Sequence, residues 1–308
     1  MKIIVVGLGI QGVKRKRIAG SDVVATVDPV VTGADYQSVE AVPTASYDAA
    51  LLCIPDEPKI KIINYLIKCG KHVLVEKPLI AEDQRELETL ADLINSNNVV
   101  CYTAYNHRFE PHFVRLKDAI KSRVLGKLYR MRFFYGNGTA RDVRNSPWRD
   151  KGGGVLHDLA SHLLDTLLFV FGSIPEELHV WSAKCFENNT FDHIIFGAMS
   201  PVLVEFEISL LSWRNHFVAE VYGENGSAHI ESLCKWGPST FTLRKRVLPS
   251  GRPPEESVTL VKADPTWELE YEYFKNLCET NGKSNIGNDL IINRHLKKLY
   301  GEATSTKQ

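Results

Sequence analysis

The chain has 308 residues, 44% hydrophobic and 24% charged, a composition typical of a soluble globular protein with room for about two domains. Its 37 basic and 37 acidic side chains balance, which argues against a partner held by bulk charge, such as nucleic acid. No apolar run approaches the ~18 residues that a membrane span needs, and the 6 cysteines form no CxxC pair. We therefore expect a cytoplasmic protein with reduced thiols and no membrane contact.

The first residues predict a dinucleotide-binding unit. Residues 2–6 (KIIVV) are typical of a buried parallel strand, and residues 7–12 (GLGIQG) fit the GxGxxG pattern. In that pattern Gly7 allows a tight turn, Gly9 the close approach of a pyrophosphate, and Gly12 the packing of the next helix on the strand. Backbone N–H groups at the helix start, around Ile10 and Gln11, would then face the phosphates.

A second predicted strand, residues 23–27, ends in Asp28, a carboxylate suited to the adenosine ribose. Asp28 would repel the additional phosphate of NADP, so NAD is favoured and NADP is the less favoured alternative. The interval from Gly12 to Asp28 is shorter than is usual for this motif, which predicts a shortened first helix. Its basic run, residues 14–17, is interpreted as a solvated face in preference to a phosphate contact.

Strands and helices continue to alternate through the first third of the chain. Strands are expected at residues 47–54, 71–75 and 99–104, and helices at residues 59–68 and 82–95. This alternation predicts an α/β fold with a doubly wound parallel sheet, in which ligands lie at the carboxyl ends of the strands. Pro55, Glu76 and Lys77 follow strands and are therefore candidates for that crevice.

Residues 152–165 (GGGVLHDLASHLLD) are the second stretch that suggests chemistry. Helical spacing places Asp158 and His162 on one narrow face, four residues apart, where a carboxylate can orient an imidazole for proton transfer. An ordinary amphipathic helix with a solvated polar face is the alternative. A metal site is not expected, because no further ligand cluster accompanies the pair.

Four segments in this order resemble the Gfo/Idh/MocA family of NAD(P)-dependent oxidoreductases: GLGIQG, HVLVEKPL, YNHRFEP and GGGVLHDLASH. The resemblance implies an N-terminal Rossmann domain, residues 1–104. It also implies a C-terminal α+β domain, residues 105–308, with a large, open, mostly antiparallel sheet. Family members commonly form dimers or tetramers through that sheet, so a homodimer or homotetramer is expected.

The family's roles transfer to matching positions. Lys77 resembles the lysine near nicotinamide and substrate, Asp158 the motif aspartate, and His162 the histidine that takes the hydroxyl proton. Asn106 resembles an asparagine beside the cofactor. Lys59 departs from the pattern, since many members have a histidine there.

The second domain is expected to carry the substrate. Residues 136–151 form a polar loop before the glycines, and its side chains Arg144, Trp148 and Arg149 are candidate substrate contacts, with a solvated loop as the alternative. Helices are expected at residues 109–122, 267–279 and 288–300, and strand-like alternation at residues 127–135 and through residues 178–247. Residues 250–256 are expected to be an exposed loop.

These patterns together predict an NAD-dependent oxidoreductase. The reaction is expected at a secondary carbinol carbon of a sugar, nucleotide sugar, sugar acid or cyclitol, with Lys77, Asp158 and His162 as the catalytic set. Two alternatives stay open: a dinucleotide-binding sensor of the same fold without turnover, and a reductase of a non-sugar substrate.

Overall fold

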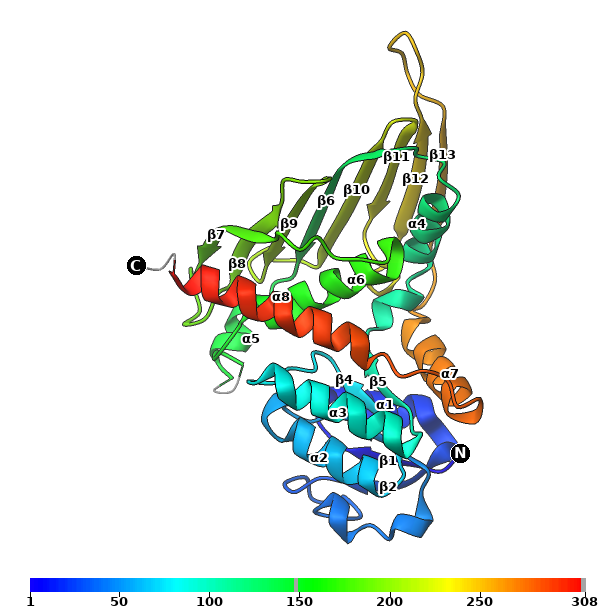
Figure 1. Cartoon of the computed structure of the whole chain (residues 1–308), viewed down its shortest axis with the longest axis vertical. Coiled ribbons are helices and arrows are strands. Elements are labelled where there is room, and N and C mark those ends of the chain that lie inside the picture. The colour runs from blue at the N-terminus through cyan, green and yellow to red at the C-terminus, as the bar shows by residue number, and fades with distance from the viewer. Residues whose placement is uncertain (147–148, 306–308) are drawn as a thin grey trace. The chain divides into compact units, whose positions relative to one another are not determined.

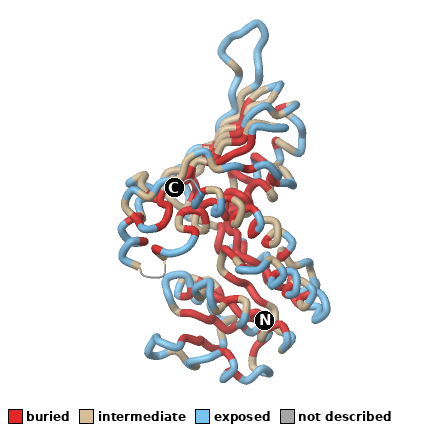
Figure 2. The backbone as a smooth tube through the Cα atoms, turned by 60° about the vertical axis from the view of Figure 1, so that its left-hand side comes forward, coloured by how far each residue is buried: buried red, intermediate tan, exposed pale blue. Residues whose placement is uncertain are grey.

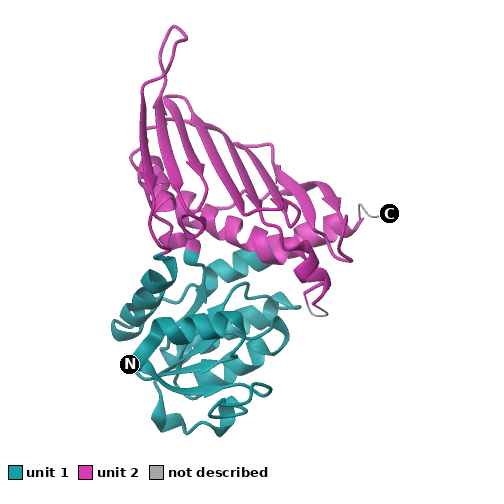
Figure 3. Ribbon diagram, turned by 180° about the vertical axis from the view of Figure 1, so that it is seen from behind, with its two compact units in different colours: residues 1–106, 265–294 teal, residues 107–264, 295–308 magenta. Residues whose placement is uncertain are grey.

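The computed structural model describes residues 1–146 and 149–305, which form two compact units (Figure 3). The first unit contains residues 1–106 and 265–294. The second contains residues 107–264 and, of the described residues, 295–305. The expected division at residue 104 lies close to the first of these boundaries. Residues 265–294, expected in the second domain, instead pack with the first unit.

The first unit is built on a parallel sheet of five strands in the order β2-β1-β3-β4-β5 (Figure 1). The strands are β1 (Ile3–Val6), β2 (Val23–Val27), β3 (Ala49–Leu52), β4 (His72–Glu76) and β5 (Cys101–Ala104). The connecting helices are α1 (Ile10–Ala19), α2 (Asp56–Lys68) and α3 (Gln84–Asn97). The strand order reverses between β1 and β3, and open α/β sheets bind ligands at the carboxyl ends of such strands.

Alternate residues of these strands enter two separate cores. Ile4 and Val6 share one core with residues of α2 and α3, whereas Ile3 and Val5 share the other with Phe274 of α7 (Thr266–Glu279). Burial on both faces explains why the strands are apolar without alternation. It also explains why α7 belongs to the first unit, since its buried face completes that second core.

The second unit is built on a sheet of eight strands in the order β13-β12-β11-β10-β6-β9-β8-β7. Only β6 and β9 run parallel; the other neighbours are antiparallel. The strands are β6 (Leu128–Gly136), β7 (His179–Lys184), β8 (His193–Ala198), β9 (Leu203–Ser209), β10 (His216–Gly223), β11 (Gly226–Glu231), β12 (Ser239–Lys245) and β13 (Glu255–Leu260). The large, mostly antiparallel sheet expected from the sequence is confirmed.

The two faces of this sheet differ in character. Phe133, Phe206 and Phe217 are fully buried on one face, while on the other Arg132 forms an ion pair with Glu205 at 3.0 Å. The remaining α-helices of the described residues are α4 (Pro111–Lys121), α5 (Ala140–Arg144), α6 (Ser161–Phe171) and α8 (Ile286–Ser305), whose residues are divided between the two units. Figure 2 shows the buried strands and the exposed connection between β12 and β13.

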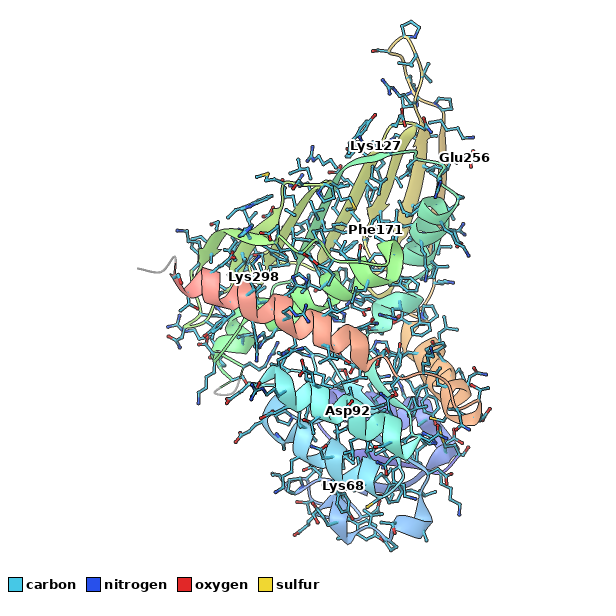
Figure 4. The ribbon with its side chains drawn as sticks, viewed as in Figure 1. Lys68, Asp92, Lys127, Phe171, Glu256 and Lys298 are labelled. Atoms are coloured by element: carbon cyan, nitrogen blue, oxygen red, sulfur yellow. The ribbon has the colours of Figure 1, made fainter. Side chains whose placement is uncertain are left out.

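Two local expectations were wrong. Residues 250–256 are not loop throughout, because β13 begins at Glu255, and Figure 4 shows Glu256 on this edge strand. Its pairing with β12 uses polar partners, such as the Thr240 and Thr259 hydroxyls 2.9 Å apart, so apolar alternation could not reveal it. The predicted polar loop before the glycines also contains the short helix α5.

Candidate functional site

The three glycines of GLGIQG serve different purposes. Gly7 has a φ of +88°, and a Cβ there would collide with the carbonyl oxygen of Cys53. A Cβ on Gly12 would collide with the carbonyl oxygen of Gly7, so this position holds α1 against the turn. A Cβ on Gly9, by contrast, would meet nothing within 4 Å. The protein itself therefore does not require glycine at residue 9, and the open space suits a closely approaching ligand.

Asp28 joins the glycine turn to the end of β2. One carboxylate oxygen accepts a hydrogen bond from Leu8 N at 2.7 Å, and the other accepts from Val30 N and Val31 N at 2.9 Å. Burial opposes its charge, but these three backbone donors hold the pKa of Asp28 below its ordinary value. An ionised carboxylate thus lies beside the turn, as a ribose-binding residue requires.

The basic run in α1 is only partly a solvated face. Arg15 is buried, with its guanidinium 2.8 Å from Glu76 and 2.6 Å from Glu270, and it lies over the ring of Trp267. The prediction of a solvated face was therefore wrong for this residue, because residues of β4 and α7 surround it. Glu76, a predicted cofactor contact, uses its carboxylate in this ion pair.

Lys59 supports the backbone around Lys77. The Lys59 side chain is buried, and its ammonium donates to the carbonyl oxygens of Glu76 at 2.8 Å and Pro78 at 2.9 Å. A third hydrogen bond, of 2.6 Å, goes to Asp56. All three donors of the ammonium are thus used, two of them on the carbonyls that flank Lys77. Lys77 itself is half-buried at the carboxyl end of β4.

Four further predicted cofactor residues lie in the first unit. Asn106 is buried, and its amide donates to the hydroxyl of Thr266 at 2.8 Å, which joins the end of the first segment to α7. Pro55 is exposed immediately before α2. Ile10 and Gln11 are exposed in the first turn of α1, where backbone N–H groups are available to a phosphate.

In the second unit, the glycine triplet leads into an irregular helix. Gly152 and Gly154 have φ values of +65° and +51°, and a Cβ on Gly154 would collide with the carbonyl oxygen of Phe191. The following turn, Leu156–Ala160, is π-helical, and α6 begins at Ser161. Such wide turns occur frequently at functional sites. The helix predicted after the three glycines was expected to be regular, so the prediction missed this turn.

Most of the polar face of this helix is buried. His162 is 8% exposed and Asp165 is 1% exposed. Both carboxylate oxygens of Asp165 accept hydrogen bonds from the guanidinium of Arg108. The His162 ring stacks on His107, with centroids 4.0 Å apart and planes at 18°. Asp158 is half-buried and lies 3.8 Å from the guanidinium of Arg149. A buried histidine with a carboxylate in the preceding turn is an arrangement suited to proton transfer.

The structure places two of the three predicted substrate contacts of the polar loop. Arg149 lies beside Asp158, as described above, whereas the guanidinium of Arg144 donates to the carbonyl oxygen of Glu187. The prediction for Trp148 falls outside the described residues.

Sequence reasoning missed a group of residues close to His162. The Tyr135 ring lies 6.1 Å from His162, and its hydroxyl is 3.1 Å from the ammonium of Lys235. That ammonium also lies 4.6 Å from the ring centroid of Trp236. The only available signal was an adjacent lysine and tryptophan in the connection between two strands.

Within the described residues, no helix has the length and apolar character of a membrane span. No group of three or more potential metal-ligating side chains occurs among those same residues.

Known proteins resemble both units. A family model described as an oxidoreductase family with an NAD-binding Rossmann fold matches residues 7–105, and one described as the GFO/IDH/MocA C-terminal domain matches residues 113–229. Inositol 2-dehydrogenase of Rhizobium meliloti is 22% identical over 174 residues, 56% of this chain and 51% of that protein. Myo-inositol 2-dehydrogenase of Thermotoga maritima is 26% identical over 141 residues, 45% of this chain and 40% of that protein. The chain thus spans about half, or less, of these relatives' lengths.

A solved structure of levoglucosan dehydrogenase, in complex with NADH and levoglucosan, has a TM-score of 0.82 at 15% identity. The match covers 99% of this chain and 97% of that one. At this identity the likeness shows that the two chains share a fold.

Proposed function

We propose that this chain, which belongs to the Gfo/Idh/MocA family of NAD-binding oxidoreductases, interconverts a secondary alcohol and a ketone on a sugar, nucleotide sugar, sugar acid or cyclitol. The observation that carries the proposal is the buried His162 with Asp158 in the preceding turn. A solvated amphipathic helix would not bury that histidine. Alcohol oxidation needs a proton acceptor and a hydride acceptor. His162 would be the first, and the dinucleotide held by the Rossmann domain would supply the second.

The dinucleotide would be held by the glycine turn and Asp28. Gly9 leaves space for the pyrophosphate, and Asp28 offers its carboxylate to the ribose hydroxyls. Because the pKa of Asp28 is held low, its negative charge disfavours the additional phosphate of NADP. We therefore propose NAD in preference to NADP. When bound, the nicotinamide supplies the hydride acceptor or donor.

The chain's own residues would then move and stabilise charge. In the oxidative direction, His162 accepts the hydroxyl proton, and Asp158 favours the resulting imidazolium. Lys77 donates a hydrogen bond to the same oxygen and stabilises its developing negative charge. Lys77 and His162 belong to different units of the chain, so their joint action on one substrate is part of the proposal.

Relatives support the substrate class. Two curated relatives are named inositol dehydrogenases, and a solved relative of the same fold is a levoglucosan dehydrogenase bound to NADH and levoglucosan. All three names refer to polyhydroxylated rings, so a sugar or cyclitol is the substrate class that we propose here.

Two substitutions test this proposal. His162→Ala and Lys77→Ala should each lower turnover at least 100-fold, a loss typical of removing a proton acceptor or an oxyanion donor. NADH binding, followed by fluorescence, should stay within a few-fold of wild type. His179→Ala, at an exposed position, is the matched control. Near-normal turnover in the His162 or Lys77 variant would refute the assigned roles.

A further inference from the structure

A cavity of about 660 Å³ opens in the second unit at the amino-terminal end of β10. Its lining residues are Arg214, Asn215, His216, Phe217, Ser232, Lys235, Trp236 and Pro238. Two of these side chains, Arg214 and Lys235, are basic, and the lining contains no carboxylate. Such a cavity favours an anion.

Lys235 connects this cavity to His162. Its ammonium contacts the hydroxyl of Tyr135 at 3.1 Å, and the Tyr135 ring lies 6.1 Å from the His162 ring. The cavity is therefore one tyrosine away from the proposed proton acceptor.

The charge of Lys235 is not neutralised by a close ion pair in the described part of the chain. Glu110, one neighbouring carboxylate, instead accepts the thiol hydrogen of Cys234 at 2.9 Å. Burial lowers the pKa of Lys235, against the attraction of Asp264, Asp158 and Glu110. An anion bound at its ammonium would offset the free-energy cost of burying this positive charge.

Arg214 supplies the second cation. It is exposed and lies just before β10. Its charge does reach into the cavity: burial, and then Arg214, lower the pKa of His216. An arginine that perturbs a neighbouring histidine in this way is well placed to attract a negative group.

We infer that this cavity is a subsite for an anionic substituent of the substrate, carboxylate or phosphate, recognised by Lys235 and Arg214, with Trp236 as an apolar wall for the sugar ring. The inference rests on the proposed function and narrows its substrate class to acidic sugars. Neutral cyclitols would give neither cation an anionic partner.

Calorimetric titration tests the subsite without turnover. The probes are D-glucuronate, D-glucose 6-phosphate and D-glucose, each added to wild-type protein with and without NADH at fixed ionic strength. At least one of the two anionic probes should bind about 10- to 100-fold more tightly than glucose. This is the range expected for one charge-assisted hydrogen bond. The tighter of the two identifies the substituent.

Variants locate the effect. Arg214→Met and Lys235→Met should each reduce the preference for the anionic probe about tenfold or more, whereas Arg252→Met, at an exposed residue of the β12–β13 connection, should leave it unchanged. Equal binding of all three sugars, or a preference that survives both substitutions, would overturn the inference. Failure of NADH to bind would instead refute the proposed function, while the titrations without NADH would still decide the subsite.

Discussion

Replacing Lys59 by methionine should destabilise the segment that carries Lys77. The side chain is 2% exposed, and its ammonium donates hydrogen bonds of 2.8 and 2.9 Å to the carbonyl oxygens of Glu76 and Pro78. Methionine fills a similar volume but has no donor. The substitution therefore leaves two backbone acceptors without their partner in a buried position.

The size of the effect follows from those two acceptors. A buried acceptor that loses its hydrogen bond costs about 1–3 kcal/mol, so the pair accounts for about 2–6 kcal/mol. Asp56, the third partner, is 45% exposed and returns to water at little cost. The removed ammonium no longer needs to be desolvated, which offsets part of the loss. We expect a decrease of about 3 kcal/mol in the free energy of unfolding.

Urea denaturation of Lys59→Met measures this decrease. Lys61→Met is the matched control, because Lys61 lies in the same helix and is exposed. The control should change the unfolding free energy by less than about 0.5 kcal/mol. Turnover of Lys59→Met should also fall more than that of the control, because the lost hydrogen bonds flank Lys77. Equal stability of the two variants would refute the reasoning.

Three more predictions follow from the same contacts. Gly9→Ala should keep wild-type stability but weaken NADH binding at least tenfold in a fluorescence titration. Gly12→Ala should lose both stability and binding, because a Cβ at residue 12, unlike one at residue 9, would collide with the protein. An NADH affinity of Gly9→Ala equal to that of the wild type would contradict this account of the turn. Arg15→Met should lower the free energy of urea unfolding by about 3–5 kcal/mol, since it removes the buried ion pair with Glu270, and the exposed Arg17→Met should not. Burial opposes the charge of Asp150, but hydrogen bonds from residues 189 and 190 hold its pKa below the ordinary value, so its contribution is present above about pH 4 and lost as pH falls below it. Asp150→Asn should therefore flatten the acid limb of a urea-unfolding series, and an unchanged limb would exclude this role.

The first unit follows closely from its sequence because its signals are local. An apolar run, a glycine turn and a following acidic residue lie within residues 2–28. The parallel sheet that these signals predict is present, with β1 and β2 as neighbours. The position of α7 was not predictable in this way. Its apolar side chains indicate a buried face, but only the folded chain shows that Phe274 packs on strands more than 150 residues away in sequence, among them the one containing Leu74.

The second unit was less predictable for a physical reason. Residues of its candidate site come from separate elements: His107 precedes α4, Tyr135 lies near the end of β6, and Lys235 follows β11. No periodicity within one segment connects them. The burial of Asp165 likewise depends on Arg108, a partner 57 residues away, so helical spacing alone suggested a solvated face.

The central claim, that this chain binds a nicotinamide dinucleotide to carry out oxidation or reduction, is tested most directly by a thermal-shift titration with NAD, NADH, NADP and NADPH. A ligand that binds only the folded state raises the melting temperature, and the rise grows with the logarithm of the ligand concentration divided by its Kd. The account predicts a rise with NAD and NADH that is larger than with NADP and NADPH. No rise with any of the four would contradict it.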